Sequence, residues 1–180
     1  MTANSLVETW TKDRALTTRD QFRSRHPYAF LVWSPSFKAR GANARPSMQQ
    51  LSFHTQVHGA DTKLVPVAHN TGHDLVLILP LKKAPESPFP DRVSVGRAPN
   101  CDIVVRDSSV SKLHGHFRDI TINAAVFTDA KSANGTTLDG VKLEPGVSTP
   151  ISEFSVIAFG RVRLRLLSPG AVYDWLGQQR

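Results

Sequence analysis

Short hydrophobic runs separated by turn residues dominate the chain from residue 74 onward. In the last run, Val162, Leu164 and Leu166 alternate with arginines, which predicts a strand with one buried and one solvated face. The pair Asp139-Gly140 predicts a two-residue hairpin turn, because both residues tolerate a positive φ. Eight or nine strands at this spacing indicate an all-β sandwich or barrel. The expected strands are 74–81, 92–96, 102–105, 113–120, 125–128, 136–138, 141–143, 155–159 and 161–167.

The first twenty-five residues show helical spacing instead. Residues 18–21, Thr-Arg-Asp-Gln, match a capping box that puts Phe22 at the fourth helical position, and residues 5–8 follow the same pattern. Pro27 then ends the helix, because the residue before a proline avoids helical geometry. The apolar run 30–33 predicts a short strand that could join the sheet formed by the later strands.

A stretch rich in Ser, Pro, Gly, Ala and Arg follows this strand, so residues 34–47 are expected to form a loop. Residues 48–70 leave helix and strand open as alternatives. After Pro169 the spacing of the apolar residues predicts a short helix that packs on the rest of the chain. The expected organisation is an N-terminal extension (1–72), a β-sandwich (73–168) and a short C-terminal helix (169–180).

Composition narrows the class of protein. Of the 180 residues, 40% are hydrophobic and 21% are charged, which is enough apolar material for a core and excludes wholesale disorder. The net charge is +7, and residues 1–70 carry most of the excess, with nine basic and four acidic side chains. This basicity suggests nucleic acid as a partner of the N-terminal part, but net charge bears on association rather than on fold.

The number of cysteines and the first residues of the sequence indicate the cellular compartment in which the protein is expected. Cys101 is the single cysteine, which excludes an internal disulfide and a cysteine-rich zinc site and fits a reducing compartment. The chain has no run of eighteen apolar residues that could span a membrane. Its first residues include Glu8 and lack the long apolar region of a secretory signal. We therefore expect a cytoplasmic protein.

Four short motifs place hydrogen-bond donors at the ends of expected strands. In a sandwich the loops at strand ends cluster, so these groups can meet. An arginine, a lysine, hydroxyls and a carboxamide together suit an anion with several oxygens, such as a phosphate dianion. The motifs are Gly96-Arg97, Ser111-Lys112-Leu113-His114, residues 129–136 (Asp-Ala-Lys-Ser-Ala-Asn-Gly-Thr) and the glycine of the hairpin after them.

The order and spacing of these motifs resemble the forkhead-associated (FHA) domain. The resemblance covers roughly residues 73–168 and is specific, because four motifs occur in register. It implies a mainly β fold, an FHA-type β-sandwich of about eleven strands that binds phosphothreonine peptides through loops at one end. It implies neither catalysis nor a cofactor, so a binding module is expected rather than an enzyme.

The resemblance assigns phosphopeptide-binding roles to five residues. Arg97 would clamp the phosphate, and the Ser111 hydroxyl would donate to another phosphate oxygen. Lys112 would add positive charge beside that serine. Asn134 would bond the peptide backbone next to the phosphoresidue, and Ser132 would brace the loop.

Four further residues would support this site. The resemblance implies that Gly96 permits close packing and that the His114 imidazole bonds within the loops, and Gly135 and Thr136 belong to the same supporting set. One position departs from the family. Many members carry a hydroxyl residue directly before the asparagine, where it contacts the phosphate, but this chain has Ala133. One hydrogen bond is therefore missing unless Ser132 substitutes for it.

Other readings of these residues are weaker. Ser111 and His114 could form a nucleophile and a base, but no nucleophile elbow accompanies them. The i, i+4 histidine pairs at 54/58 and 69/73 have the spacing of metal ligands on a helix, but glycines beside them disfavour that helix, so no metal site is expected.

Charged side chains outside the motifs are expected to serve local structure. The arginines at 161, 163 and 165 form a basic stripe that simple alternation explains as a solvated strand face, and those at 19, 23 and 25 are read as a solvated helix face. Asp102 and Asp107 are expected to bond turn amides.

The expected partner is a phosphothreonine-containing protein that is a substrate of a Ser/Thr kinase, and no small-molecule substrate is expected. Two alternatives stay open. The sandwich could be a phosphate-independent scaffold, a reading that Ala133 favours. The basic residues 1–70 could bind nucleic acid, and a steep salt dependence lost on truncating them would reveal it.

Overall fold

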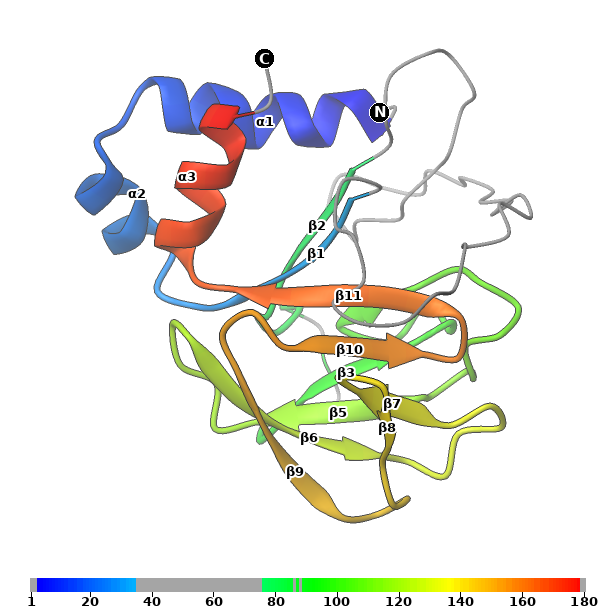
Figure 1. Cartoon of the computed structure of the whole chain (residues 1–180). Helices are drawn as coiled ribbons and strands as arrows, with labels where there is room; N and C mark the ends of the chain where they lie inside the picture. Colours follow the sequence, from blue (N-terminus) through cyan, green and yellow to red (C-terminus); the bar gives the residue numbers. More distant parts are fainter. Residues whose placement is uncertain (1–2, 35–75, 86, 88, 179–180) are drawn as a thin grey trace.

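The structure is a computed structural model that describes residues 3–34, 76–85, 87 and 89–178. Within these ranges the chain forms eleven strands and three helices (Figure 1). The strands are β1 (Phe30–Trp33), β2 (Leu77–Pro80), β3 (Val93–Gly96), β4 (Ile103–Val104), β5 (Gly115–Arg118), β6 (Ala124–Asp129), β7 (Thr136–Leu138), β8 (Val141–Lys142), β9 (Ser148–Ser152), β10 (Val156–Phe159) and β11 (Val162–Leu167).

Two sheets pack face to face as a β-sandwich. One sheet has the order β2-β1-β11-β10-β7-β8, and the other has the order β4-β3-β5-β6-β9. Neighbouring strands are antiparallel in nearly every pair, and β3 and β4 are parallel. The fold class is therefore mainly β, as the hydrophobic pattern predicts.

One hydrophobic core fills the space between the sheets. Its centre is aromatic: the ring centroids of Phe117 and Phe127 lie 4.9 Å apart, and those of Phe127 and Phe159 lie 5.4 Å apart. All three side chains are fully buried. Burial of each contributes roughly 2–3 kcal/mol, so this cluster stabilises the contact between the two sheets.

Local sequence signals predict several elements correctly. Asp139 and Gly140 have φ values of 51° and 88°, as the hairpin turn between β7 and β8 requires. The alternation in β11 also holds, because Val162 and Leu164 are buried while Arg163 is exposed. The pattern misses β9, which contains one buried hydrophobic residue, Ile151, among polar residues and a proline. A proline is compatible with this strand because β9 is an edge strand.

The predicted strand at residues 30–33 is β1, and it lies inside a sheet. It pairs with β2 on one side and with β11 on the other, with Phe30 opposite Leu167. Phe30, Leu31 and Val32 are all fully buried, so both faces of the strand are covered. The division proposed at residue 72 thus places one strand of this sheet in the N-terminal extension.

Three helices cover the outer face of the sheet beside β1, β2 and β11 (Figure 1). They are α1 (Ala3–Ala15), α2 (Arg19–Arg25) and α3 (Pro169–Gln178), and the predicted C-terminal helix is α3. A second hydrophobic cluster joins this layer to the sheet. Its buried members are Phe22, Phe30, Val32, Ile78, Leu167, Val172, Trp175 and Leu176.

The start of one helix is predicted correctly and the start of the other is not. Thr18 caps α2 with a complete capping box, in which its side chain accepts from the N–H of Gln21 and the Gln21 side chain accepts from the N–H of Thr18. The matching pattern at Ser5 is misleading, because α1 already includes Ala3. The physical reason is that serine is also tolerated within a helix.

The arginines at 19, 23 and 25 are exposed, as predicted, and each also forms an ion pair. Arg19 binds Asp174 of α3 through two guanidinium nitrogens. Arg25 pairs with Asp13, and Arg23 pairs with Asp20. The Arg19 pair ties α2 to α3, so it joins an N-terminal helix to the C-terminal one.

The predicted loop at 34–47, the ambiguous stretch at 48–70 and both histidine pairs lie mainly or wholly outside the described residues. Among the helices that the structure describes, none has the length and apolar character needed to cross a membrane.

Candidate functional site

Backbone hydrogen bonds bring three loops together at one end of the sandwich. The N–H of Arg97, just after β3, donates to the carbonyl oxygen of Ser111 at 2.8 Å, and the N–H of Ala98 donates to that of Lys112 at 3.0 Å. The N–H of Ala133, in the loop between β6 and β7, donates to Oγ of Ser111 at 2.9 Å. The motif residues predicted to meet are therefore neighbours, and Ser111 is at their centre.

The Arg97 side chain is exposed, and one hydrogen bond from its Nε fixes it to the neighbouring loop. Its Nε donates to the carbonyl oxygen of Val110 at 3.1 Å. Its two Nη groups form no hydrogen bond or ion pair with any residue that the structure describes. The remaining N–H donors of the guanidinium are therefore available to an anion in the solvent, with the geometry of a planar fork.

Ser111 keeps one donor for a ligand. Its N–H donates to Nδ1 of His114 at 3.1 Å, and its hydroxyl oxygen accepts from Ala133. A hydroxyl has one hydrogen to donate, and the described contacts of Ser111 Oγ use it as an acceptor. Lys112 follows with an exposed side chain that forms no ion pair within the described ranges.

Gly96 and His114 lie directly beside these loops. A Cβ at Gly96 would lie 2.2 Å from the carbonyl oxygen of Lys112, so only glycine fits beneath the loop without a backbone shift. The His114 ring is fully buried. Burial lowers its pKa, although Asp129 and the carbonyl of Gly135 oppose this. The ring is thus neutral at pH 7, and its proton is on Nε2 because Nδ1 accepts from Ser111.

Asp129 organises the loop between β6 and β7, a role that the sequence leaves unassigned. Its buried carboxylate accepts from the N–H and the hydroxyl of Ser132, both at 2.7 Å, and from the hydroxyl of Thr136. Burial by itself would raise the pKa of Asp129, but these hydrogen bonds outweigh it and hold the pKa below its usual value. The Ser132 hydroxyl is therefore used inside the loop and does not replace the hydroxyl that Ala133 lacks.

Asn134 is exposed at the tip of the same loop. Its Nδ2 donates to the carbonyl oxygen of Ser109 at 2.8 Å, which links it to the loop that carries Ser111. Its side-chain oxygen is an acceptor that suits a peptide N–H. Gly135 follows with a φ of 74°, which lets the chain turn back into β7.

The sequence model of the FHA domain matches residues 93–160. These residues form an FHA domain. The curated FHA domain-containing protein PS1 of Arabidopsis thaliana is 34% identical over 67 residues, which cover 37% of this chain and 4% of that protein. The chain thus corresponds to a small part of that relative.

Solved structures of FHA domains are also similar to this chain. The FHA domain of the CT664 protein from Chlamydia trachomatis is 25% identical, covers 54% of this chain and 90% of its own, and has a TM-score of 0.44. The MEK1 FHA domain in complex with the HOP1 pThr318 peptide is 26% identical, covers 51% and 88% of the two chains, and has a TM-score of 0.40.

One arginine of the predicted basic stripe has a structural role in the FHA domain. Nε of Arg161 donates to the buried carboxylate of Asp107 at 3.0 Å, and the N–H of Arg161 donates to Oγ of Ser109 at 3.1 Å. The turn between β10 and β11 is thereby fixed to the loop that positions Asn134. Arg161 is exposed, as predicted, and it also binds Asp107, a partner 54 residues away that alternation cannot reveal.

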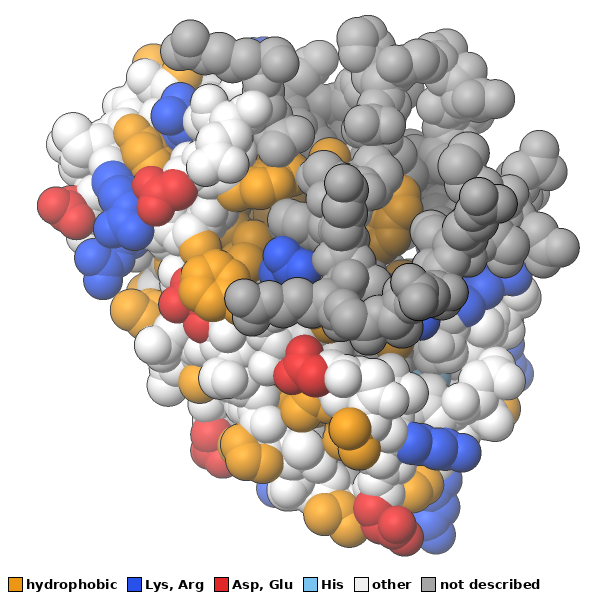
Figure 2. Space-filling model, in the orientation of Figure 1, with side chains coloured by type: hydrophobic (Ala, Val, Ile, Leu, Met, Phe, Trp, Pro, Cys, Tyr) orange, Lys and Arg blue, Asp and Glu red, His pale blue; other side chains and the backbone are white. Residues whose placement is uncertain are grey.

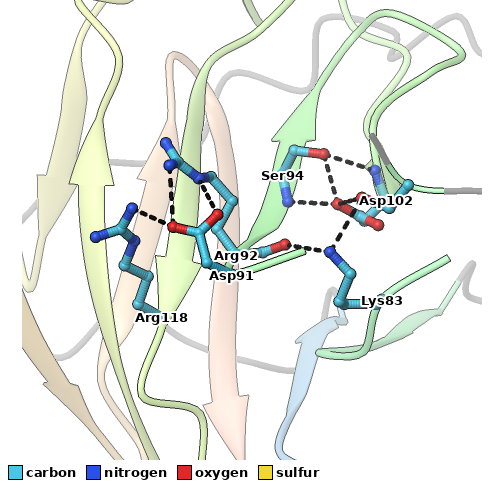
Figure 3. A network of polar contacts seen from close by, with 7 residues as sticks. Lys83, Asp91, Arg92, Ser94, Asp102 and Arg118 are labelled. Atoms are coloured by element: carbon cyan, nitrogen blue, oxygen red, sulfur yellow. Dashed lines mark hydrogen bonds and ion pairs between the residues drawn. The ribbon is translucent and has the colours of Figure 1, made fainter. Parts of the chain in front are cut away.

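A second acidic residue anchors the segment that precedes β3 (Figure 3). Asp102 accepts from the N–H and the hydroxyl of Ser94 and from the N–H of Ala84. In the same view Asp91 lies between Arg92 and Arg118, whose guanidinium groups both bind it. Like Asp107, which accepts from the N–H of Ser109, Asp102 bonds turn amides as predicted.

The stability of the FHA domain is expected to fall in two steps as the pH is lowered. The pKa of His114 is lowered in the folded state, so below the unfolded value of about 6.5 the unfolded chain binds the proton more readily. The pKa values of Asp102, Asp107 and Asp129 are also lowered, because their hydrogen bonds outweigh burial. Their contribution is present above about pH 4 and is lost below it.

Thermal melting followed by circular dichroism from pH 8 to pH 3 measures both steps. The melting temperature is expected to decline first below about pH 6.5 and then more steeply below about pH 4. A melting temperature that stays constant from pH 7 to pH 5 would contradict the burial of a neutral His114.

Proposed function

We propose that this chain binds phosphothreonine segments of partner proteins and serves as an adaptor in Ser/Thr-kinase signalling. The observation that carries the proposal is the meeting of Arg97 and Ser111, which come from different loops and are joined by a 2.8 Å backbone hydrogen bond. Both keep donors that the described residues do not use. A phosphate monoester carries about −1.5 to −2 charges near neutral pH, so it matches a guanidinium and a hydroxyl carried by neighbouring residues.

The peptide around the phosphate would be held by the neighbouring side chains. Asn134 offers its side-chain oxygen to a peptide N–H and would keep the ligand extended, and Lys112 would add a positive charge beside Ser111. Ser132 braces the loop through Asp129 rather than contacting the ligand. This geometry supports our proposal that these residues have the roles implied by the family resemblance.

The expected affinity is that of a reversible reader. Each charge-assisted hydrogen bond contributes roughly 1.5–3 kcal/mol net. Three or four such bonds, less the entropy cost of ordering a flexible peptide, give a Kd on the order of micromolar. A complex of this affinity dissociates readily, so a phosphatase can reach the phosphothreonine and end the signal.

A peptide-library titration tests the proposal. The full chain is titrated with phosphothreonine peptides and with the same peptides lacking the phosphate, and binding is followed by fluorescence anisotropy. We expect micromolar binding of phosphorylated sequences and at least a hundredfold weaker binding of their unphosphorylated counterparts. Equal binding of both sets would favour the second candidate function, a phosphate-independent scaffold, which the missing hydroxyl at Ala133 suggests.

The geometry does not favour catalysis by Ser111 and His114. The bond between them joins the backbone N–H of Ser111, not its hydroxyl, to Nδ1 of His114. The imidazole is also fully buried, so it has no access to a substrate in the solvent. We therefore infer that this pair supports binding rather than catalysis.

Nucleic-acid binding by the N-terminal part is the third candidate, and the structure weakens it. Arg19, Arg23 and Arg25 each pair with a carboxylate, which reduces the positive field of α1 and α2. Cys101 is a buried thiol that donates to the carbonyl oxygen of Lys112 and forms no disulfide, so the cytoplasm, a reducing compartment, suits the adaptor role that we propose.

A further inference from the structure

Four exposed cationic side chains surround the site, one on each of four neighbouring segments. Arg97 follows β3, Lys112 precedes β5, Lys131 lies between β6 and β7, and Lys142 lies on β8. None of them forms an ion pair with an acidic group in the described part of the chain. Lys and Arg side chains gather along the right-hand edge of Figure 2, where Figure 1 places the turns after β6 and β10.

Two of these cations are placed close to the tip of the site. The Lys142 side chain lies close to Gly135. If Gly135 carried a Cβ, the Cε of Lys142 would be 3.1 Å and its Nζ 3.8 Å from that atom. Gly135 directly follows Asn134, so the Lys142 ammonium is beside the residue proposed to hold the ligand backbone. Lys131 directly precedes Ser132 in the same loop.

With the exception of Glu144, the acidic residues of these loops face inward or are already paired. Asp129 is 1% exposed and is bound by Ser132 and Thr136, while Asp107 is bound by Arg161. Glu144 is exposed but pairs with no described lysine or arginine. Outward charge at this end of the domain is therefore mainly positive.

We propose that the partner segment is acidic: it carries several carboxylates or further phosphates beside the phosphothreonine, and Lys131 and Lys142 bind them. This inference rests on the proposed function, since it names the ligand class of the same site. Exposed charge pairs contribute little individually and are screened by salt. Several of them together give a preference for acidic flanks of roughly fivefold to tenfold at low salt.

A protein segment fits these loops better than nucleic acid does. Binding of single strands uses aromatic side chains on which bases stack. Residues 97–102, 105–114, 130–135 and 142–147, which lie at this end, contain no Phe, Tyr or Trp. The charges instead flank a compact pair of phosphate donors, which is the arrangement that an acidic phosphopeptide would require.

The test compares two phosphothreonine peptides that differ in charge and not in shape. One has glutamates at four flanking positions, and its twin has glutamines there. Fluorescence anisotropy with the full chain at 50 mM salt is expected to show the glutamate peptide binding roughly fivefold to tenfold more tightly, with the difference shrinking to about twofold or less at 500 mM.

Two variants assign the preference to these lysines. In the double variant Lys131→Gln and Lys142→Gln, the glutamate peptide is expected to lose most of its advantage, while the affinity for the glutamine twin falls by no more than about twofold. The matched control is Lys12→Gln, an exposed lysine on α1, which is expected to leave both affinities as in the parent. Melting temperatures of all proteins confirm that the fold is kept.

The outcomes separate this inference from the proposed function. If both phosphopeptides bind equally and their unphosphorylated forms do not, the acidic preference is wrong and the phosphothreonine reader stands. If neither phosphopeptide binds, both proposals fall. If a single-stranded oligonucleotide binds as tightly as the glutamate peptide and loses that binding in the double variant, the surface is a nucleic-acid site and the inference is overturned.

Discussion

Replacing Arg97 with alanine is expected to abolish phosphopeptide binding at micromolar concentrations while the melting temperature stays within a few degrees of the parent. The side chain is exposed, and one hydrogen bond, from Nε to Val110, holds its stem. Its Nη groups would supply two charge-assisted bonds to the phosphate, together roughly 3–6 kcal/mol, so the affinity should fall by at least a hundredfold. Isothermal titration calorimetry measures the loss.

Two further variants sharpen this result. Arg97→Lys is expected to bind weakly, because an ammonium group cannot reproduce the planar fork of a guanidinium. Arg23→Ala is the matched control, since Arg23 lies on α2 at the far side of the helical layer (Figure 1) and its nearest carboxylate is 3.7 Å away. Parental affinity in Arg97→Ala would show that the phosphate site has been placed on the wrong residues.

Replacing Asp129 with alanine is expected to lower both stability and affinity. The substitution removes the acceptor of three hydrogen bonds and leaves the fully buried Thr136 hydroxyl without it. Unsatisfied buried groups cost roughly 1–3 kcal/mol each, so the free energy of unfolding should fall by about 3–5 kcal/mol and the melting temperature by about 10 °C. Because Ser132 is released, the loop that holds Ala133 and Asn134 loses its support and phosphopeptide affinity falls too.

Denaturant unfolding measures this effect, and two comparisons interpret it. Asp129→Asn keeps the shape and one acceptor, so a smaller loss is expected. Asp20→Ala removes a carboxylate that is 90% exposed on α2, and its effect should stay within about 0.5 kcal/mol. An unchanged stability in Asp129→Ala would mean that the buried carboxylate does not organise the loop.

The sequence allows the parts of the fold that depend on local chemistry to be predicted. The capping box at Thr18, the turn at Asp139-Gly140 and the alternation in β11 are each set by neighbouring residues, and the structure contains all three. The motif spacing also identifies Arg97 and Ser111 as neighbours, because the loops at one end of a sandwich converge.

Features that depend on distant partners could not be read in this way. The bond between Arg161 and Asp107 joins residues that no local pattern connects. The sequence likewise does not show whether the Ser132 hydroxyl faces a ligand or Asp129, since both need the same donor. The hydrophobic pattern does not predict β9, because an edge strand needs few apolar residues and only Ile151 of this strand faces the core.

The position of β1 determines when the six-stranded sheet can be completed during synthesis. Phe30 leaves the ribosome well over a hundred residues before Leu167, the residue it pairs with. Until then the apolar side chains of β1 lack their β11 partner, and such non-local pairing is slow and prone to aggregation. Strands β3, β5 and β6 pair over much shorter separations, so the sheet carrying the recognition loops can form while translation continues, before the N-terminal strand is in place.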